Sequence, residues 1–169
     1  MTGIKHQTNN WRNYYIDIIA LLPFLALLFT GAILLAYHVG KTPELETFGF
    51  DGHMWLLLHK LATVISVPLI LLHLILHLNW LKKLITFKLK NKNKGKNITL
   101  FVLFMLCVVT SFLSWVIFKD SETGDGLRGI HNKFGILLIV LFTFHIISYT
   151  RWLINMTRKI FKHEEKSVD

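Results

Sequence analysis

Nine histidines occur in this chain of 169 residues, and four of them form two pairs with equal spacing. His59 and His73 are fourteen residues apart, and so are His131 and His145. Fourteen helical residues rise about 21 Å and complete about four turns at the period of a left-handed bundle, so both members of a pair face the same seam. Because imidazole is a common metal ligand, each pair predicts two metal-binding levels along one helix.

The two pairs also match each other in height. If their helices run in the same direction, His59 lies level with His131, and His73 lies level with His145. Each level then offers two imidazoles that face one another across a bundle, as the axial ligands of a haem iron do. The single cysteine, Cys107, excludes covalent attachment through Cys-x-x-Cys-His. We therefore expect two non-covalent haems between the second and fourth helices.

Small and cationic residues near these histidines fit a flat cofactor with two carboxylates. Gly31 and Gly135 would let a porphyrin face approach helix backbone, although close helix packing favours the same residues. Lys60 and Arg128 are placed for the propionates of the outer haem, and Arg151 for those of the inner one. Side chains of this kind are also ordinary anchors at the membrane interface, so both roles remain open.

His77 is the alternative to His73 as a ligand of the inner haem. It lies eighteen residues from His59, which is about five whole turns of an ideal helix. It also lies about 6 Å farther along that helix than His73, so matching heights with His145 favours His73. His77 is then expected to hydrogen-bond the ligand or a propionate.

Four apolar segments must position these histidines, and each is long enough to cross a bilayer, which takes about 20 helical residues. They cover residues 14–37, 54–80, 98–118 and 130–152. We expect an all-α, integral-membrane four-helix bundle with up-down-up-down topology over residues 14–160, with tails at 1–13 and 161–169. Ionisable residues inside such helices are rare and usually functional, which favours histidines that act as ligands.

The composition agrees with a membrane protein and argues against nucleic-acid binding. Hydrophobic residues make up 53% of the chain although its formal net charge is +9, whereas a nucleic-acid-binding domain of this size would not be half hydrophobic. Lysines gather between residues 82 and 96, and acids lie in the other two connections. The positive-inside rule therefore places both termini and the lysine loop on the cytoplasmic side of the cell membrane. There we expect the loop to contact anionic lipid, and docking of an acidic cytoplasmic partner is the alternative.

The runs 59–80 and 131–152 are related by an offset of 72 residues, and each contains His-x13-His and ends in tryptophan. This pattern resembles the four-helix dihaem core of the cytochrome b of quinol–cytochrome c reductases. It resembles more closely a family of small, stand-alone, four-helix membrane cytochromes b. The resemblance implies two b-type haems with bis-histidine iron, a state that favours electron transfer over oxygen chemistry.

These observations predict transmembrane electron transfer between a quinone pool and a redox partner protein on the outer side. The chain would then be a subunit of a larger oxidoreductase or a homodimer, without catalytic residues of its own. One alternative keeps the haems but makes the chain an oxidoreductase in itself, acting on superoxide or ferric iron at the outer face. Another is a non-haem metal transporter, or a scaffold in which the histidines are interhelical contacts.

Overall fold

The computed structural model describes residues 2–39, 44–86, 88 and 94–168, and within these ranges it is helical and contains no strand. Such a structure is expected for an apolar chain, because only helices and closed barrels satisfy every backbone polar group inside a bilayer. The helices in chain order are α1 (Thr2–Ile33), the π-helical turn η1 (Leu34–His38), α2 (Gly52–Leu76), α3 (Leu78–Ile85), α4 (Lys94–Phe112), the π-helical turn η2 (Leu113–Ile117) and α5 (Glu122–Val168).

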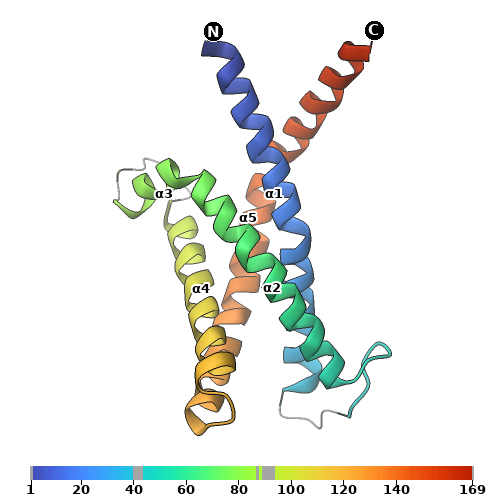
Figure 1. Ribbon diagram of the computed structural model, residues 1–169, viewed down its shortest axis with the longest axis vertical. Coiled ribbons are helices and arrows are strands. Elements are labelled where there is room, and N and C mark those ends of the chain that lie inside the picture. The colour runs from blue at the N-terminus through green and yellow to red at the C-terminus, as the bar shows by residue number, and fades with distance from the viewer. Residues whose placement is uncertain (1, 40–43, 87, 89–93, 169) are drawn as a thin grey trace.

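Four of these helical stretches are long and apolar enough to cross a membrane. They are Asn13–His38, Gly52–Leu76, Lys94–Ile117 and Glu122–Phe161. The stretches alternate in direction, so that both termini and α3 lie at one end of the molecule and the α1–α2 and α4–α5 connections lie at the other (Figure 1). The expected four spans and their up-down-up-down order are therefore present.

Two boundaries differ from those expected. The second helix ends at Leu76, with His77 as its cap, and α3 follows as a separate helix, so the described residues hold five α-helices rather than four. The last helix begins at Glu122, well before the apolar run at residue 130. Ser121 explains this early start, because its hydroxyl accepts the backbone N–H of Gly124 at 3.1 Å and so caps the first turn.

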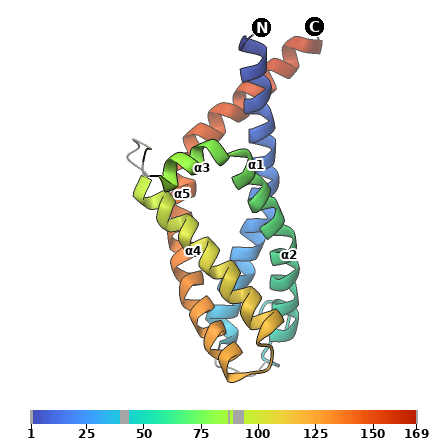
Figure 2. The same cartoon turned by 60° about the vertical axis from the view of Figure 1, so that its left-hand side comes forward.

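The helices form two hairpins, with α1 packed along α2 and α4 packed along α5. Figure 2 shows the hairpins side by side, apart below α3, while α1 and α5 meet again towards the termini, where the hydroxyls of Tyr14 and Thr157 lie 2.8 Å apart. The buried core between them is small and is built from apolar side chains of three helices: Phe24, Leu103, Phe104, Cys107 and Leu138.

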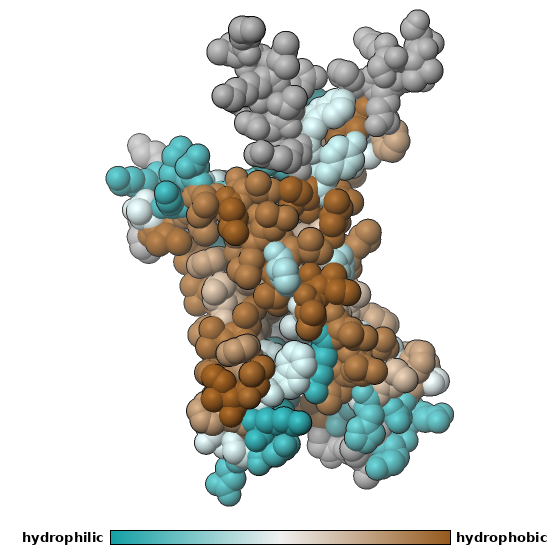
Figure 3. All heavy atoms as spheres, viewed as in Figure 1, coloured by the Kyte–Doolittle hydropathy of each residue, from teal (hydrophilic) through white to brown (hydrophobic). Residues whose placement is uncertain are grey.

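The outer face of the bundle is apolar over its middle and hydrophilic towards its ends (Figure 3). Leu22 and Ile147, for example, are each 66% exposed although they lie in the middle of long helices. An apolar belt of this size would be a liability in water but is normal for helices surrounded by lipid. The four helices therefore have the surface expected of a multi-pass membrane protein.

Candidate functional site

The paired histidines line two of the cavities that the described residues form, one towards the termini and one towards the opposite end. The terminus-side cavity has a volume of about 610 Å³ and is lined by His73 and His145. The loop-side cavity has a volume of about 570 Å³ and is lined by His59 and His131. Both volumes fall in the range of about 300–1,000 Å³ that is typical of ligand and cofactor sites. The histidines that the spacing pairs by height therefore line the same cavity in each case.

In the loop-side cavity, His59 of α2 and His131 of α5 face each other. Their ring centroids are 6.4 Å apart and their planes are inclined by 71°. Nδ1 of His131 lies 3.1 Å from the carbonyl oxygen of Cys107, and Nδ1 of His59 lies 3.0 Å from Oγ1 of Thr30. Because a carbonyl oxygen can only accept, Nδ1 of His131 carries the ring proton and Nε2 keeps its lone pair.

Thr30 sets the same tautomer on His59. Its hydroxyl lies 2.9 Å from the carbonyl oxygen of Ala26 and 3.0 Å from that of Leu27, so its single proton is donated within α1. The hydroxyl oxygen is then left to accept the Nδ1–H of His59. His59 and His131 therefore both have Nδ1 held by the protein and Nε2 available as a metal ligand.

The two predicted glycines have different surroundings. A Cβ atom on Gly31 would lie 3.1 Å from Cε1 of His59, so this glycine lets α1 approach the imidazole itself rather than a cofactor face. Gly135 also lines the loop-side cavity, and a Cβ atom built there would meet no protein atom within 4 Å. Gly135 therefore borders open space, as a residue beside a bound group would.

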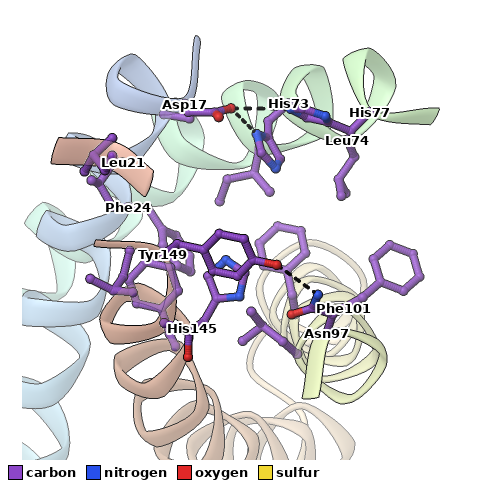
Figure 4. A pocket seen from close by; sticks show the side chains of 18 of the residues that line it. Asp17, Leu21, Phe24, His73, Leu74, His77, Asn97, Phe101, His145 and Tyr149 are labelled. Atoms are coloured by element: carbon purple, nitrogen blue, oxygen red, sulfur yellow. Dashed lines mark hydrogen bonds and ion pairs between the residues drawn. The ribbon is translucent and has the colours of Figure 1, made fainter. Parts of the chain in front are cut away.

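In the terminus-side cavity, Asp17 of α1 joins the two histidines at the end of α2 (Figure 4). Nδ1 of His73 lies 2.7 Å from Oδ1 of Asp17, and Nε2 of His77 lies 3.6 Å from the same oxygen. His73 therefore keeps Nε2 available, whereas His77 turns that atom towards the carboxylate. Asp17 is not among the predicted site residues, although an isolated acid in an apolar span is a signal that could have identified it.

His145 lies across this cavity from Asp17 and His73, and its ring packs on Tyr149 with centroids 4.5 Å apart (Figure 4). Its Nδ1 is buried and has no hydrogen-bond partner among the described residues. Next to it, Nδ2 of Asn97 donates to the hydroxyl of Tyr149 at 3.2 Å, while Oδ1 of Asn97 is buried and meets no hydrogen-bond partner in the described part of the chain. Unsatisfied buried polar atoms are rare and costly, so this wall of the cavity is suited to a polar ligand.

Aromatic side chains separate the two cavities. Phe24 lies in edge-to-face contact with Phe104 and Phe142, with ring centroids 6.2 and 4.7 Å apart. Phe24, Phe104 and Leu138 line both cavities. The polar groups of the two cavities are thus divided by an apolar layer.

The cavities also differ in charge. Among the described residues, the one formally charged side chain that lines the terminus-side cavity is Asp17. The charged residues that line the loop-side cavity are Lys60, Lys119, Asp120 and Arg128. Arg151, which the sequence places near the inner haem, is exposed on α5 and does not line the terminus-side cavity.

Comparisons with known proteins do not assign this arrangement to a family. No family model, no curated protein and no solved structure matches the chain. The function must therefore be inferred from the two cavities and from the residues that line them.

Proposed function

We propose that this chain is a membrane-embedded dihaem cytochrome b that carries electrons across the bilayer, with one haem bound in each cavity. The geometry of His59 and His131 is the observation that carries the proposal. A metal-bound imidazole nitrogen lies about 2 Å from the metal and about 1 Å from its ring centre, so two axial imidazoles place their ring centres about 6 Å apart. The ring centroids of this pair are separated by 6.4 Å.

The hydrogen bonds of these rings support the same role. Metal-ligating histidines almost always donate their other ring N–H to a carbonyl, a carboxylate or a similar acceptor, which fixes the tautomer and the orientation of the ring. The Cys107 carbonyl performs this role for His131, and the Thr30 hydroxyl performs it for His59. In the loop-side cavity, Lys60 and Arg128 would neutralise propionates, and Gly135 would leave room for the ring.

The terminus-side cavity offers a second set of ligands. His73 would bind through Nε2 with its Nδ1 held by Asp17, and His145 would bind from the opposite wall. The unpartnered amide oxygen of Asn97 and the hydroxyl of Tyr149 are suited to hydrogen-bond a polar substituent or a bridging water. Haem with two histidine ligands supplies one-electron transfer and leaves no coordination position for a substrate.

The remaining residues would exclude water and separate the two sites. The layer of Phe24, Phe104 and Leu138 keeps the space between the cavities apolar. With the lysine loop and the termini on the cytoplasmic side, the terminus-side cavity holds the inner haem and the loop-side cavity the outer one. A quinone pool and an outer-side redox protein would be the electron donor and acceptor, and the chain would act as a subunit of a larger complex or as a homodimer.

Haem counting on the purified, detergent-solubilised protein tests this proposal. We expect a reduced-minus-oxidised spectrum of b-type haem and two haems per chain. His131→Ala and His145→Ala should each remove one haem, and the double variant should remove both. His6→Ala, in the polar N-terminal tail, is the matched control and should retain two. A folded protein without haem, or ligand variants with unchanged haem content, would refute the proposal.

A non-haem metal site is the second candidate, and one observation favours it. Asp17, His73 and His77 offer three ligand atoms that all lie within 4.8 Å of one another. Two histidines and a carboxylate are the ligand set of many non-haem iron sites. Metal analysis distinguishes the candidates, since this one predicts a bound transition metal, no haem spectrum, and loss of the metal in Asp17→Asn.

A further inference from the structure

We propose that Asp17 and the cations around the other cavity give the terminus-side site the lower reduction potential, so that electron transfer from the terminus-side site to the loop-side site is the downhill direction. With the termini in the cytoplasm, this direction is outward. The inference rests on the proposed function and deepens it, because equal histidine spacing alone leaves the direction open. Two independent features of the cavities support it: the groups that hold the ligands, and the charges that line the walls.

The ligand histidines are held by groups of different charge. Asp17 approaches Nδ1 of His73 to 2.7 Å with a carboxylate oxygen, whereas His59 and His131 are held by a neutral hydroxyl and a neutral carbonyl. A stronger acceptor on the outer nitrogen makes the imidazole a more basic ligand. A more basic ligand stabilises the oxidised iron, so Asp17 lowers the reduction potential at the terminus-side site.

The charges that line the cavities act in the same direction. Reduction adds an electron, so a nearby anion opposes it and a nearby cation favours it, and these effects are strong where water is excluded. Asp17 is the charged residue on the terminus-side wall, whereas the loop-side wall carries three cations and one carboxylate. Among the cations, Lys60 is half-buried and held in place, with Nζ 5.2 Å from the ring centre of Trp115.

One cation near the terminus-side cavity opposes this order in part. Lys96 is half-buried and its ammonium donates to the hydroxyl of Ser148, a residue that lines the cavity, so its charge acts on His145. Lys96 itself does not line the cavity, whereas Asp17 lines it and bonds directly to the ligand His73. At the loop side, Arg128 is paired with Asp125 and Lys119 is exposed, which leaves the half-buried Lys60 as the cation expected to have the largest effect.

Under the proposed function, this direction makes the quinone pool the electron donor. A membrane quinol at the cytoplasmic side would be oxidised to quinone, releasing two protons and two electrons. The electrons would pass singly through the two sites to a one-electron acceptor on the outer side. The protein would therefore consume reducing equivalents of the quinone pool rather than replenish that pool.

A potentiometric titration of the holoprotein tests the inference, with the haem absorbance resolved into two components. Asp17→Asn should raise the reduction potential of the lower-potential component. We expect a change of about tenfold in its one-electron equilibrium constant, which corresponds to about 59 mV, and no change in the potential of the upper component. Lys60→Gln should lower the upper component. Glu46→Gln, which removes an exposed acid in the α1–α2 connection, is the matched control and should shift neither.

The outcomes separate this inference from the proposed function. If Asp17→Asn raises the upper component or shifts neither, the assigned direction is wrong although the protein still binds two haems. If no haem is present, the proposed function fails and the inference fails with it. If Asp17→Asn does not fold, Lys60→Gln still tests the inference. The inference is overturned if Lys60→Gln shifts the reduction potential of the lower component, or if it shifts neither potential. Asp17→Glu, which keeps the charge, should retain the wild-type order.

Discussion

Thr30 gives the sharpest test of how the loop-side site is built. Replacing it with valine keeps the volume and shape of a side chain that is only 7% exposed, while removing the oxygen that accepts the Nδ1–H of His59. The imidazole then loses the group that fixes its tautomer and its orientation. We expect Thr30→Val to weaken haem binding in the loop-side cavity and to leave the terminus-side cavity unchanged.

The magnitude follows from the role of the hydrogen bond. Loss of a partner that orients a metal ligand typically costs 10- to 100-fold in affinity, or about 1.4–2.8 kcal/mol. The hydrogen bond from Thr30 to His59, at 3.0 Å, is of ordinary strength and largely shielded from water, so the effect should fall within this range. Thr30→Ser retains the hydroxyl and should restore most of the affinity.

The assay is the rate at which haem transfers from the purified protein to excess apomyoglobin. Wild type should release its two haems in two phases, and Thr30→Val should accelerate one of them by about 10- to 100-fold. Thr63→Val is the matched control, because Thr63 lines the same cavity and, among the described residues, its hydroxyl donates to the backbone carbonyl of His59 and not to the imidazole. If Thr30→Val and Thr63→Val release haem at equal rates, the hydrogen bond to His59 does not stabilise a cofactor ligand.

Three further predictions concern packing and access. Gly135→Ala adds a Cβ atom that meets no protein atom within 4 Å, so the folded chain should be as stable as wild type while haem content per chain falls. Phe24→Ala removes a 6%-exposed ring from the core and should lower the free energy of unfolding in detergent by about 3–5 kcal/mol. Trp55→Phe removes the bond from Nε1 to the Thr47 carbonyl at 2.9 Å and should cost about 1 kcal/mol, measured as faster proteolysis of the α1–α2 connection.

The sequence predicts the spans and the histidine pairs well because the spans depend on the length of apolar segments and the pairs depend on residue spacing. Hydrophobic length alone locates four membrane helices, and equal spacing brings His59 to His131 across the bundle. Local hydrogen bonds are harder to predict from apolar patterning. The start of the last helix at Glu122 depends on the Ser121 cap, which lies outside the apolar run. The break at His77 likewise falls inside a continuous apolar stretch.

The groups that hold the histidines were predicted least well, because they come from other helices. Asp17 reaches His73 from a position 56 residues earlier in the chain, and Cys107 supplies a backbone oxygen rather than its thiol. A backbone acceptor has no residue-type signature, so no sequence pattern could have identified it. Asp17 does have one, since a lone acid in an apolar span requires a partner, and the nearby histidines of the second span are the natural partners.

A comparison of the two hairpins shows where the two halves of the molecule differ. The second helices of the hairpins, α2 and α5, are related by an offset of 72 residues, whereas the first helices, α1 and α4, align at an offset of 80. At that offset Thr30 corresponds to Thr110, and Asp17 corresponds to Asn97. The first hairpin therefore has a carboxylate that binds the Nδ1 of His73. The second has an amide at the corresponding position, which bonds to Tyr149 and leaves Nδ1 of His145 without a partner among the described residues.

This single difference has both a structural and a functional consequence. A carboxylate at both positions would place two acids in one apolar cavity, and their mutual repulsion and desolvation would be costly. With Asn97 in place of the second acid, the cavity keeps one negative charge, and that charge is bound to His73 of α2 rather than shared with His145 of α5. The difference between Asp17 and Asn97 therefore lowers the electrostatic cost of the cavity, and it would also make His73 a more basic ligand than His145. A symmetric pair of hairpins with an amide at both positions could bind two cofactors, but it would lack the fixed anion that we propose orders their potentials.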